Sequence, residues 1–235
     1  MNRFFLNDTL NKDVIVIKDR ALIHQMKNVL KLHKGERVGF FNEEPQFVGF
    51  DFVSELKNLD PGMAIFMVRE KIENTRESSR KLVLYQSLIK KDNFEWVLEK
   101  ATEVGVSEIV PVLSARSEKK TLNSVRCQLI LKEAAEQAGR AFIPKMRGVL
   151  IFEKAIMEAQ SSGRKTYFAY EEESHNMIHG VGERSMNLFI GPEGGWEERE
   201  ILAIHRVGFE IISLGRLTLR AETAAISAAY TLLWV

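Results

Sequence analysis

The sequence has little cysteine, the residue that forms disulfides in small secreted domains and binds zinc in many structural sites. Its 235 residues include one cysteine, Cys127, and five prolines. A single cysteine excludes an internal disulfide and a zinc site built from cysteine pairs, and it fits a reducing compartment. No apolar run reaches the roughly 18 residues of a membrane span, and the start of the chain lacks a signal peptide's apolar core. We therefore expect a cytoplasmic protein in which Cys127 is an inert, half-buried thiol on a helix.

The net charge is also small, at +1, but it is unevenly distributed along the chain. Residues 80–147 carry 13 basic and 8 acidic side chains, whereas residues 148–235 carry 8 and 12. A basic middle segment suits binding to a phosphate backbone, although solvated helix faces would give the same pattern.

The first 72 residues predict a small, strand-rich module. Residues 19–35 have the apolar spacing of one helix, with Asp19 as its N-cap and Gly35 as its stop. Three β-like runs follow, separated by Glu-Pro and Asp-Pro-Gly turn signals, at residues 36–42, 46–56 and 64–72. We expect a little barrel, followed by a polar linker over residues 73–81 that contains no large apolar side chain.

From residue 82 onward, strands and helices alternate. This order predicts an α/β domain over residues 82–235, with a mostly parallel sheet covered by helices. The predicted strands are 81–89, 107–114, 165–170, 186–191 and 208–215, and the predicted helices are 93–105, 124–139, 197–208 and 223–235.

Three loops in the last third follow predicted strands, and two of them contain glycine: AYEEES, GPEGGWEE and GRLTLRAET. Ligands of open parallel sheets bind beyond the carboxyl ends of the strands, so these loops are candidate neighbours, although each is also compatible with a plain tight turn. The Lys and Ser/Thr of a phosphate-binding loop are missing, and Glu193, Glu197 and Glu198 would repel a polyphosphate. A cationic nucleoside such as S-adenosylmethionine fits better.

Five blocks of the sequence, in order, carry a resemblance to a known family. They are HQMKNVLKLHKGE, IKKDNFEWVLEKATEVGVSEIVPVLSARS, EAAEQAGR, IGPEGGW and SLGRLTLRAETAA. Together they resemble the 16S ribosomal RNA uridine-N3 methyltransferases, the RsmE family of the SPOUT superfamily. The resemblance implies a PUA-like barrel over residues 1–72, a SPOUT α/β domain with a trefoil knot over 82–235, and a homodimer. It also implies that S-adenosylmethionine binds in the knot, that no metal is needed, and that the substrate is 16S rRNA or the small ribosomal subunit.

The same resemblance suggests which residues carry the chemistry. Arg220 is the expected stabiliser of a uridine anion, and Glu222 the expected base or orienting carboxylate, with a helix-start ion pair as the alternative. Leu217 departs from the family's usual arginine, so Arg216 is given no role. The expected cofactor-binding residues are Tyr170, Glu171, Gly191, Gly194, Leu214, Gly215 and Leu219.

RNA contacts are expected from basic side chains in both parts of the chain. In residues 19–35, His24, Lys27 and Lys31 are spaced to form one phosphate-facing stripe, although a lone histidine is more often structural. The other expected RNA-binding residues are Arg3, Lys90, Lys100 and Arg116. Gln137 and Arg140 are expected to hold the uridine or the partner protomer's loop, with a solvated helix end as the alternative.

Two other classes of function stay open at the level of sequence. An RNA-binding module could keep the cofactor fold without catalysis, but Arg220 and Glu222 are both present. A nucleotide-dependent oxidoreductase would need a phosphate-cradling loop, and the sequence has none.

Overall fold

The chain forms two compact units. The computed structural model describes residues 1–7, 10, 13–118, 121–173, 175–179 and 182–235. Unit 1 consists of residues 1–77 together with 135–142, and unit 2 of residues 78–134 and 143–235. The break between residues 77 and 78 lies inside the predicted linker, whereas the grouping of residues 135–142 with unit 1 was not predicted.

Unit 1 is built on a five-stranded sheet with the order β1-β3-β4-β5-β2. The β1 strand is parallel to β3, and the other neighbours are antiparallel. The three predicted runs correspond to β3, β4 and β5, but the two short outer strands were missed. The elements are β1 (Arg3–Phe5), β2 (Val14–Ile17), α1 (Arg20–His24), the π-helix η1 (Gln25–Val29), β3 (Arg37–Phe41), β4 (Phe50–Asp60) and β5 (Met63–Glu73).

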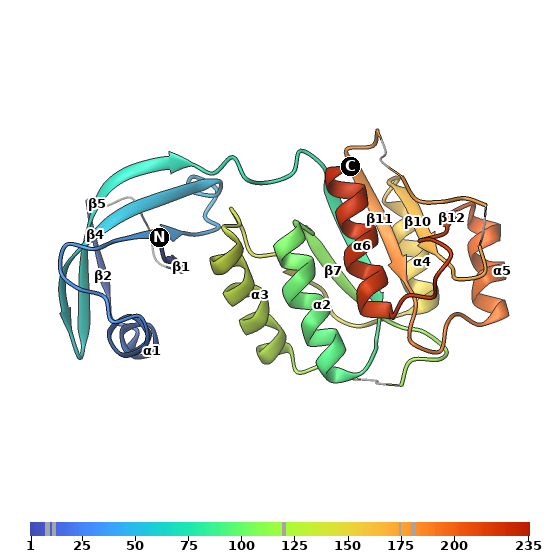
Figure 1. Ribbon diagram of the computed structural model, residues 1–235, viewed down its shortest axis with the longest axis horizontal. Coiled ribbons are helices and arrows are strands. Elements are labelled where there is room, and N and C mark those ends of the chain that lie inside the picture. The colour runs from blue at the N-terminus through green and yellow to red at the C-terminus, as the bar shows by residue number, and fades with distance from the viewer. Residues whose placement is uncertain (8–9, 11–12, 119–120, 174, 180–181) are drawn as a thin grey trace. The chain divides into compact units, whose positions relative to one another are not determined.

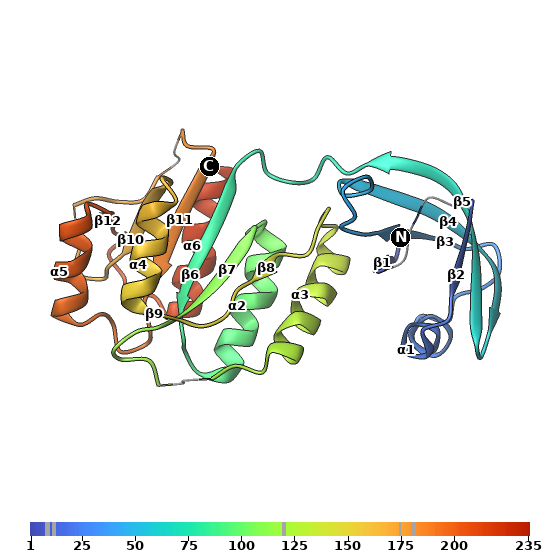
Figure 2. The ribbon, with the colours of Figure 1, turned by 180° about the vertical axis from the view of Figure 1, so that it is seen from behind.

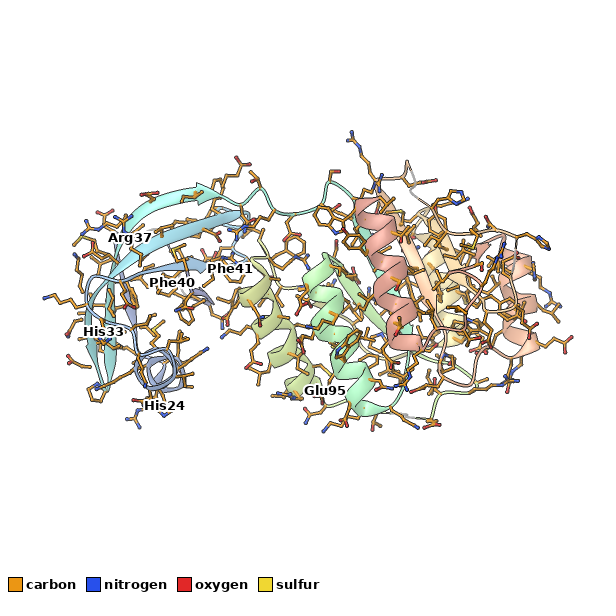
Figure 3. All side chains as sticks on the ribbon, viewed as in Figure 1. His24, His33, Arg37, Phe40, Phe41 and Glu95 are labelled. Carbon is orange, nitrogen blue, oxygen red and sulfur yellow. The ribbon has the colours of Figure 1, made fainter. Side chains whose placement is uncertain are left out.

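Aromatic rings fill the centre of unit 1. The ring of Phe40 on β3 lies 6.0 Å from that of Phe4 and 4.9 Å from that of Phe66. The next residue, Phe41, contacts Phe5 instead, with ring centroids 5.6 Å apart. Because successive strand residues point to opposite faces, this pair of phenylalanines covers both sides of the sheet (Figure 3).

The prediction of one continuous helix over residues 19–35 is wrong. Asp19 does cap the start, since its carboxylate accepts hydrogen bonds from the N–H groups of Ala21 and Leu22. The α-helical hydrogen bonds then give way to the π-helix η1, and Lys31 adopts a left-handed conformation with φ of 51°. The segment therefore ends before Lys31, and Val29 of the predicted apolar stripe is exposed.

Unit 2 has a parallel sheet with the order β12-β10-β11-β6-β7-β8, and β9 also pairs with β7. Its elements are β6 (Lys81–Ser87), α2 (Lys91–Val104), β7 (Glu108–Leu113), α3 (Ser124–Ala138, its end in unit 1), β8 (Lys145–Met146), β9 (Leu150–Ile151), α4 (Phe152–Ser161), β10 (Lys165–Ala169), β11 (Ser185–Ile190), α5 (Glu198–Val207), β12 (Glu210–Ile212) and α6 (Ala221–Trp234). The α/β fold with a parallel sheet is as predicted, and α4 was missed.

Helices cover both faces of this sheet. Figure 1 and Figure 2 show α2 and α6 on one face and α4 on the other. On the first face, α6 contributes Ala225, Ala228 and Ala229 to an apolar core that also contains Cys127, which is only 3% exposed. On the second face, α4 and α5 pack against Tyr85 and neighbouring side chains of the sheet. Among the helices of the described residues, none is long and apolar enough to cross a membrane.

Candidate active site

A cavity of about 630 Å³ lies in unit 2 where the carboxyl ends of β6, β10, β11 and β12 meet. All three loops singled out in the sequence contribute to it, which confirms that they are neighbours. The start of α2 supplies a further wall. The lining residues are Lys90, Asn93, Ala169, Tyr170, Glu171, Ile190, Gly191, Pro192, Glu193, Gly195, Trp196, Ser213, Leu214, Gly215, Arg216, Leu217, Thr218, Leu219, Arg220, Ala221, Glu222 and Ala224.

Most of the predicted cofactor-binding residues lie in this cavity. They are Tyr170, Glu171, Gly191, Leu214, Gly215 and Leu219. Gly194 is not part of the lining, and its carbonyl instead accepts a 2.8 Å hydrogen bond from Nη1 of Arg116. Their binding role stays a prediction, but the sequence did identify residues that share one cavity.

Glycine is needed in the loop after β11 because an indole ring lies against it. A Cβ atom at Gly191 would lie 3.0 Å from ring atoms of Trp196, closer than real Cβ atoms normally approach. Trp196 in turn donates a 3.0 Å hydrogen bond from Nε1 to the carbonyl of Ala169 at the end of β10. The indole thus joins two strand ends. Four residues later than Gly191, Gly195 has φ of +70°, a left-handed conformation that favours glycine.

Charged side chains fix this loop to its surroundings. A carboxylate oxygen of Glu193 accepts a 3.0 Å hydrogen bond from the backbone N–H of Lys90, the N-cap residue of α2. On the other side, Glu200 accepts from the N–H of Ala115, at 3.0 Å. Sequence analysis placed Glu193 in the turn but missed its partner. The one available signal was that the lysines at the start of α2, Lys90 and Lys91, have no side-chain oxygen that could cap the helix.

Arg220 and Glu222 lie at the start of α6, in the wall of the cavity. Nη1 of Arg220 is 4.0 Å from Oε1 of Glu222, and the Arg220 side chain is 84% exposed. An ion pair this long and this exposed to water contributes little to stability. The alternative role of Arg220 and Glu222, as an ion pair that caps the start of α6, therefore has weak support. Oε2 of Glu222 is buried and has no hydrogen-bond partner among the described residues.

A buried carboxylate oxygen without a donor costs about 1–3 kcal/mol. The cost is avoided when a bound ligand supplies an N–H, an O–H or a positive charge. Glu222 therefore marks the place in the cavity where a ligand donor is most favoured.

Tyr170 is not suited to act as a base. Its hydroxyl donates a 2.7 Å hydrogen bond to Glu172, and this bond, together with burial and neighbouring carboxylates, raises the pKa of Tyr170 to about 12. The phenol therefore stays protonated at neutral pH, with its proton donated to Glu172.

The predicted RNA-binding cations of unit 2 have different environments. Lys90 lies in the cavity wall, whereas Arg116 is hydrogen-bonded to the carbonyl of Gly194. Lys100 lies on α2 and pairs with Glu99 and Glu103, and its hydrogen bonds to these carboxylates raise its pKa. Lys90 is thus the predicted cation that the structure brings to the candidate site.

Arg3 and Arg140 do not support the prediction that they contact RNA, because both side chains are buried in unit 1. Arg3 pairs with Asp51 and also donates to the carbonyl of Arg140 at 2.8 Å. Arg140 pairs through Nε with Glu77 at 2.9 Å. The remaining predicted residue of this segment, Gln137, is exposed at the end of α3. The two arginines hold residues 135–142 in unit 1.

A second cavity, of about 640 Å³, lies in unit 1 and is mainly basic and polar. It includes Lys27 and Lys31, two of the predicted RNA-binding residues, whereas His24 is exposed on the helical segment outside the lining (Figure 3). We call it the basic groove. Its lining residues are Lys27, Asn28, Lys31, Leu32, His33, Lys34, Leu56, Lys57, Asn58 and Leu59.

The backbone around the basic groove is unusual. Among the described residues, Lys31 is the one non-glycine residue with positive φ, and η1 is the one π-helix. Both features are energetically unfavourable, and both are frequent at functional sites. The unusual backbone and the basic side chains therefore both indicate a functional site in this part of unit 1.

Comparison with known proteins assigns the family. The family model described as an RNA methyltransferase domain matches residues 76–233. The ribosomal RNA small subunit methyltransferase E of Mesomycoplasma hyopneumoniae is 32% identical over 162 residues, which cover 67% of this chain and 71% of that protein. The Bacillus subtilis protein of the same name is 28% identical, with 88% of this chain and 84% of that protein covered.

A solved structure agrees with this assignment. The crystal structure of a ribosomal RNA small subunit methyltransferase E from Neisseria gonorrhoeae, bound to S-adenosyl methionine, is 26% identical and superposes with a TM-score of 0.87. The superposition covers 97% of this chain and 95% of that one. This chain therefore belongs to the RNA methyltransferase family and, within it, to the ribosomal RNA small subunit methyltransferases E.

Proposed function

We propose that this protein transfers a methyl group from S-adenosylmethionine to N3 of a specific uridine in 16S small-subunit rRNA. The observation that carries the proposal is the cavity of unit 2, in which glycine-rich loops from adjacent strand ends surround the buried, unpartnered carboxylate oxygen of Glu222. The family to which the chain belongs supplies the reaction class.

The residues present fit S-adenosylmethionine. The cavity volume of about 630 Å³ is within the usual range for small-molecule sites. Glycines and the backbone of residues 213–219 expose main-chain donors and acceptors suited to a nucleoside, while Glu171, Glu193 and Glu222 favour a positively charged ligand. We propose that Tyr170, Glu171, Gly191, Gly194, Leu214, Gly215 and Leu219 hold it, Gly194 through the shape of its loop.

When bound, S-adenosylmethionine supplies an electrophilic methyl group, whose carbon–sulfur bond breaks with its electron pair going to sulfur as the carbon–nitrogen bond forms. The protein must hold the uracil N3 in line with that methyl group and favour loss of the N3 proton. We propose that Arg220 stabilises the negative charge that develops on the uracil. Glu222, with one free buried oxygen, acts as the base or as the carboxylate that orients the substrate.

The finer features of the fold are part of the same proposal. We propose that unit 1 is a PUA-like barrel and that the C-terminal part of unit 2 forms the trefoil knot of the SPOUT superfamily. The strand order supports this, because β11 lies between β10 and β6 although β6 is far earlier in the chain. Such crossovers are needed for a knot, which ordinary folds avoid.

The proposed RNA surface includes the basic groove of unit 1, through Lys27 and Lys31, and His24, which lies on the helical segment before them and outside the groove lining. Recognition of N3 requires a single-stranded or extruded uridine, because this edge is covered in a base pair. Lys90, Lys100, Arg116 and Gln137 remain proposed contacts in the basic middle of the chain.

We also propose that the protein acts as a homodimer in the cytoplasm. Large aromatic side chains in unit 2 support a protein interface, since Trp96, Tyr230 and Trp234 are between 42% and 53% exposed. Exposed aromatic side chains are typical of interface centres. Light scattering coupled to size-exclusion chromatography tests this, and a monomer at micromolar concentration would contradict it.

One experiment tests the activity directly. Small ribosomal subunits and naked 16S rRNA from a strain lacking this protein are incubated with the purified protein and labelled S-adenosylmethionine, and the RNA is mapped by mass spectrometry. We expect one N3-methyluridine in one of the two substrates. Cofactor binding without methyl transfer to either would indicate an RNA-binding protein that is not an enzyme.

A further inference from the structure

The start of α2 contributes a wall of the candidate active-site cavity that is separate from the three loops after β10, β11 and β12. Lys90 and Asn93 line the cavity from this side. Lys90 is the N-cap residue of α2, and its backbone N–H donates a 3.0 Å hydrogen bond to Glu193 in the loop after β11. The backbone that carries the Lys90 side chain is therefore hydrogen-bonded to another residue that lines the same cavity.

The Lys90 ammonium is available for a ligand. The neighbouring Lys91 pairs at 3.8 Å with Glu95 on α2, and Glu95 also pairs with Arg126 of α3 (Figure 3). By contrast, within the described part of the chain no carboxylate lies within ion-pair distance of the Lys90 ammonium. Glu193, which also lines the cavity, already accepts a hydrogen bond from the Lys90 backbone N–H. An exposed, unpaired ammonium in a cavity wall needs little reorganisation to contact a substrate.

Lys90 and Arg220 have matching places in the fold. Each is the N-cap residue of a long helix, α2 or α6, and each lines the cavity. The partial positive charge at a helix N-terminus adds to the charge of the side chain there. The two cations therefore come from different elements and can approach one ligand from two directions.

A uracil anion is a ligand with two sites for such cations. Loss of the N3 proton spreads the negative charge over O2 and O4, the oxygens on either side of N3. One cation for each oxygen stabilises the anion most, and neither needs to approach N3 itself. Donor-only groups at these positions also disfavour cytosine, which presents an amino group in place of O4.

We propose that Lys90 contacts one carbonyl oxygen of the target uracil and stabilises the anion formed when N3 loses its proton, as Arg220 does from the other side. Glu193 is the positioning residue that holds the Lys90 backbone. This rests on the proposed function and adds to it a base-contacting catalytic residue, where sequence analysis predicted only a general RNA contact for Lys90.

Several other charged groups line the same cavity and also influence how the methylation rate depends on pH. Glu171, Glu193 and Glu222 oppose an anion, whereas Arg216 and Arg220 favour it. On α2 itself, Asp92 lies in the first turn beside Lys91. All of these are unchanged in a Lys90 variant, so a change in the pH profile reports on Lys90.

The test compares Lys90→Gln, Lys90→Arg and the matched control Lys91→Gln in the full-length protein. Single-turnover methylation of the small-subunit RNA substrate is measured from pH 6 to 9.5, and S-adenosylmethionine affinity is measured by calorimetry. We expect Lys90→Gln to lose about tenfold in rate at pH 7, because the apparent pKa for uracil deprotonation rises by about one unit. The loss should shrink as the pH rises, while cofactor affinity stays within twofold.

Lys90→Arg should keep most of the rate, since it keeps the charge, and Lys91→Gln should match the wild type. An equal loss for Lys90→Gln at every pH would assign Lys90 a purely structural or RNA-binding role and overturn the proposal. So would an unchanged rate. If the wild type methylates no small-subunit RNA at all, the proposed function fails instead, which separates the two outcomes.

Discussion

Arg220 and Glu222 are two residues apart, yet their environments are opposite. The arginine side chain is 84% exposed, whereas the glutamate is 12% exposed and has one oxygen without a partner among the described residues. A purely structural pair would be expected to satisfy both charges. The asymmetry instead leaves an exposed cation and a buried carboxylate lining one cavity, which suits chemistry on a substrate that enters from solvent.

Arg220→Ala should lower turnover far more than cofactor affinity. If Arg220 stabilises the uracil anion, its loss removes an interaction made in the transition state and should cost about 100-fold in kcat. The dissociation constant for S-adenosylmethionine, measured by calorimetry, should change less than threefold. Unchanged turnover would remove Arg220 from the active site and leave it as a helix N-cap residue.

Gly191→Ala tests the contact between the loop after β11 and Trp196. The added methyl group would lie 3.0 Å from the indole ring, which must shift and so strain its hydrogen bond to Ala169. We expect a loss of about 1–3 kcal/mol in the free energy of unfolding and weaker cofactor binding.

Gly148→Ala is the matched control for this substitution, because a Cβ there meets no atom within 4 Å. Urea unfolding and calorimetry on both variants give the comparison. Equal behaviour of the two alanine variants would mean that the loop adapts to the methyl group at no cost.

At the scale of elements, the sequence predicted best those helices and strands that carry their own signals. Gly105 ends α2 in a left-handed conformation, as its position after an amphipathic run indicates. The helix α4 was missed although Phe152, Ala155, Ile156 and Ala159 form a buried stripe at helical spacing. Its N-cap position is held by Ile151, which offers no capping oxygen, so the usual start signal is absent.

The active-site cavity was predictable in part for the same reason. Strand ends and loop glycines are local signals, and they identified three loops that line one cavity. The bond from Lys90 to Glu193 joins residues more than 100 positions apart. It has no local signal, so the wall formed by the start of α2 could not be found from spacing alone.

The short strand β12 offers a prediction about acid sensitivity. Glu210 on β12 pairs with Lys165 on β10, and this hydrogen bond, with a smaller contribution from Asn176, lowers the pKa of Glu210. A carboxyl group with a lowered pKa in the folded state adds stability above its unfolded pKa, and that stability is lost as the pH falls through the folded pKa.

Lys165→Met should therefore reduce the free energy of unfolding by about 0.5 kcal/mol at pH 7, since the pair is partly exposed. The difference from wild type should disappear as the pH approaches 3. Lys154→Met, on the exposed face of α4, is the control and should show no such dependence. Urea unfolding at several pH values measures this, and a constant difference at all pH values would contradict it.

At the scale of the whole molecule, long-range ion pairs define the units. Residues 135–142 belong to unit 1 because Arg3 donates to the Arg140 carbonyl and Glu77 pairs with the Arg140 side chain. From the sequence, Arg3 was expected to contact RNA, and Arg140 to hold the uridine or the partner protomer's loop. Their buried ion-pair partners, Asp51 for Arg3 and Glu77 for Arg140, lie 48 and 63 positions away in the sequence. Burial of these side chains therefore could not be inferred from residue type or local spacing.

The division into units leads to a prediction about RNA affinity. The cavity with the catalytic candidates belongs to unit 2, whereas the basic groove with Lys27 and Lys31 belongs to unit 1. If the groove holds the RNA backbone, the double change Lys27→Glu with Lys31→Glu should weaken RNA binding. It should reduce the slope of log K against log salt by about 1.5 to 2, because two phosphate contacts are lost. At saturating RNA, kcat should be unchanged, because the cavity in unit 2 is intact.

Lys18→Glu with Arg20→Glu makes the same change in charge at exposed positions outside the groove lining. This control should lower affinity slightly and leave the slope nearly unchanged, since long-range attraction is screened over about 10 Å at 0.1 M salt. Fluorescence anisotropy with a fragment of small-subunit rRNA, from 50 to 300 mM salt, measures both variants. An unaltered slope in the groove variant would move the RNA backbone to another surface of the protein, and the cations of unit 2 would then be the next to test.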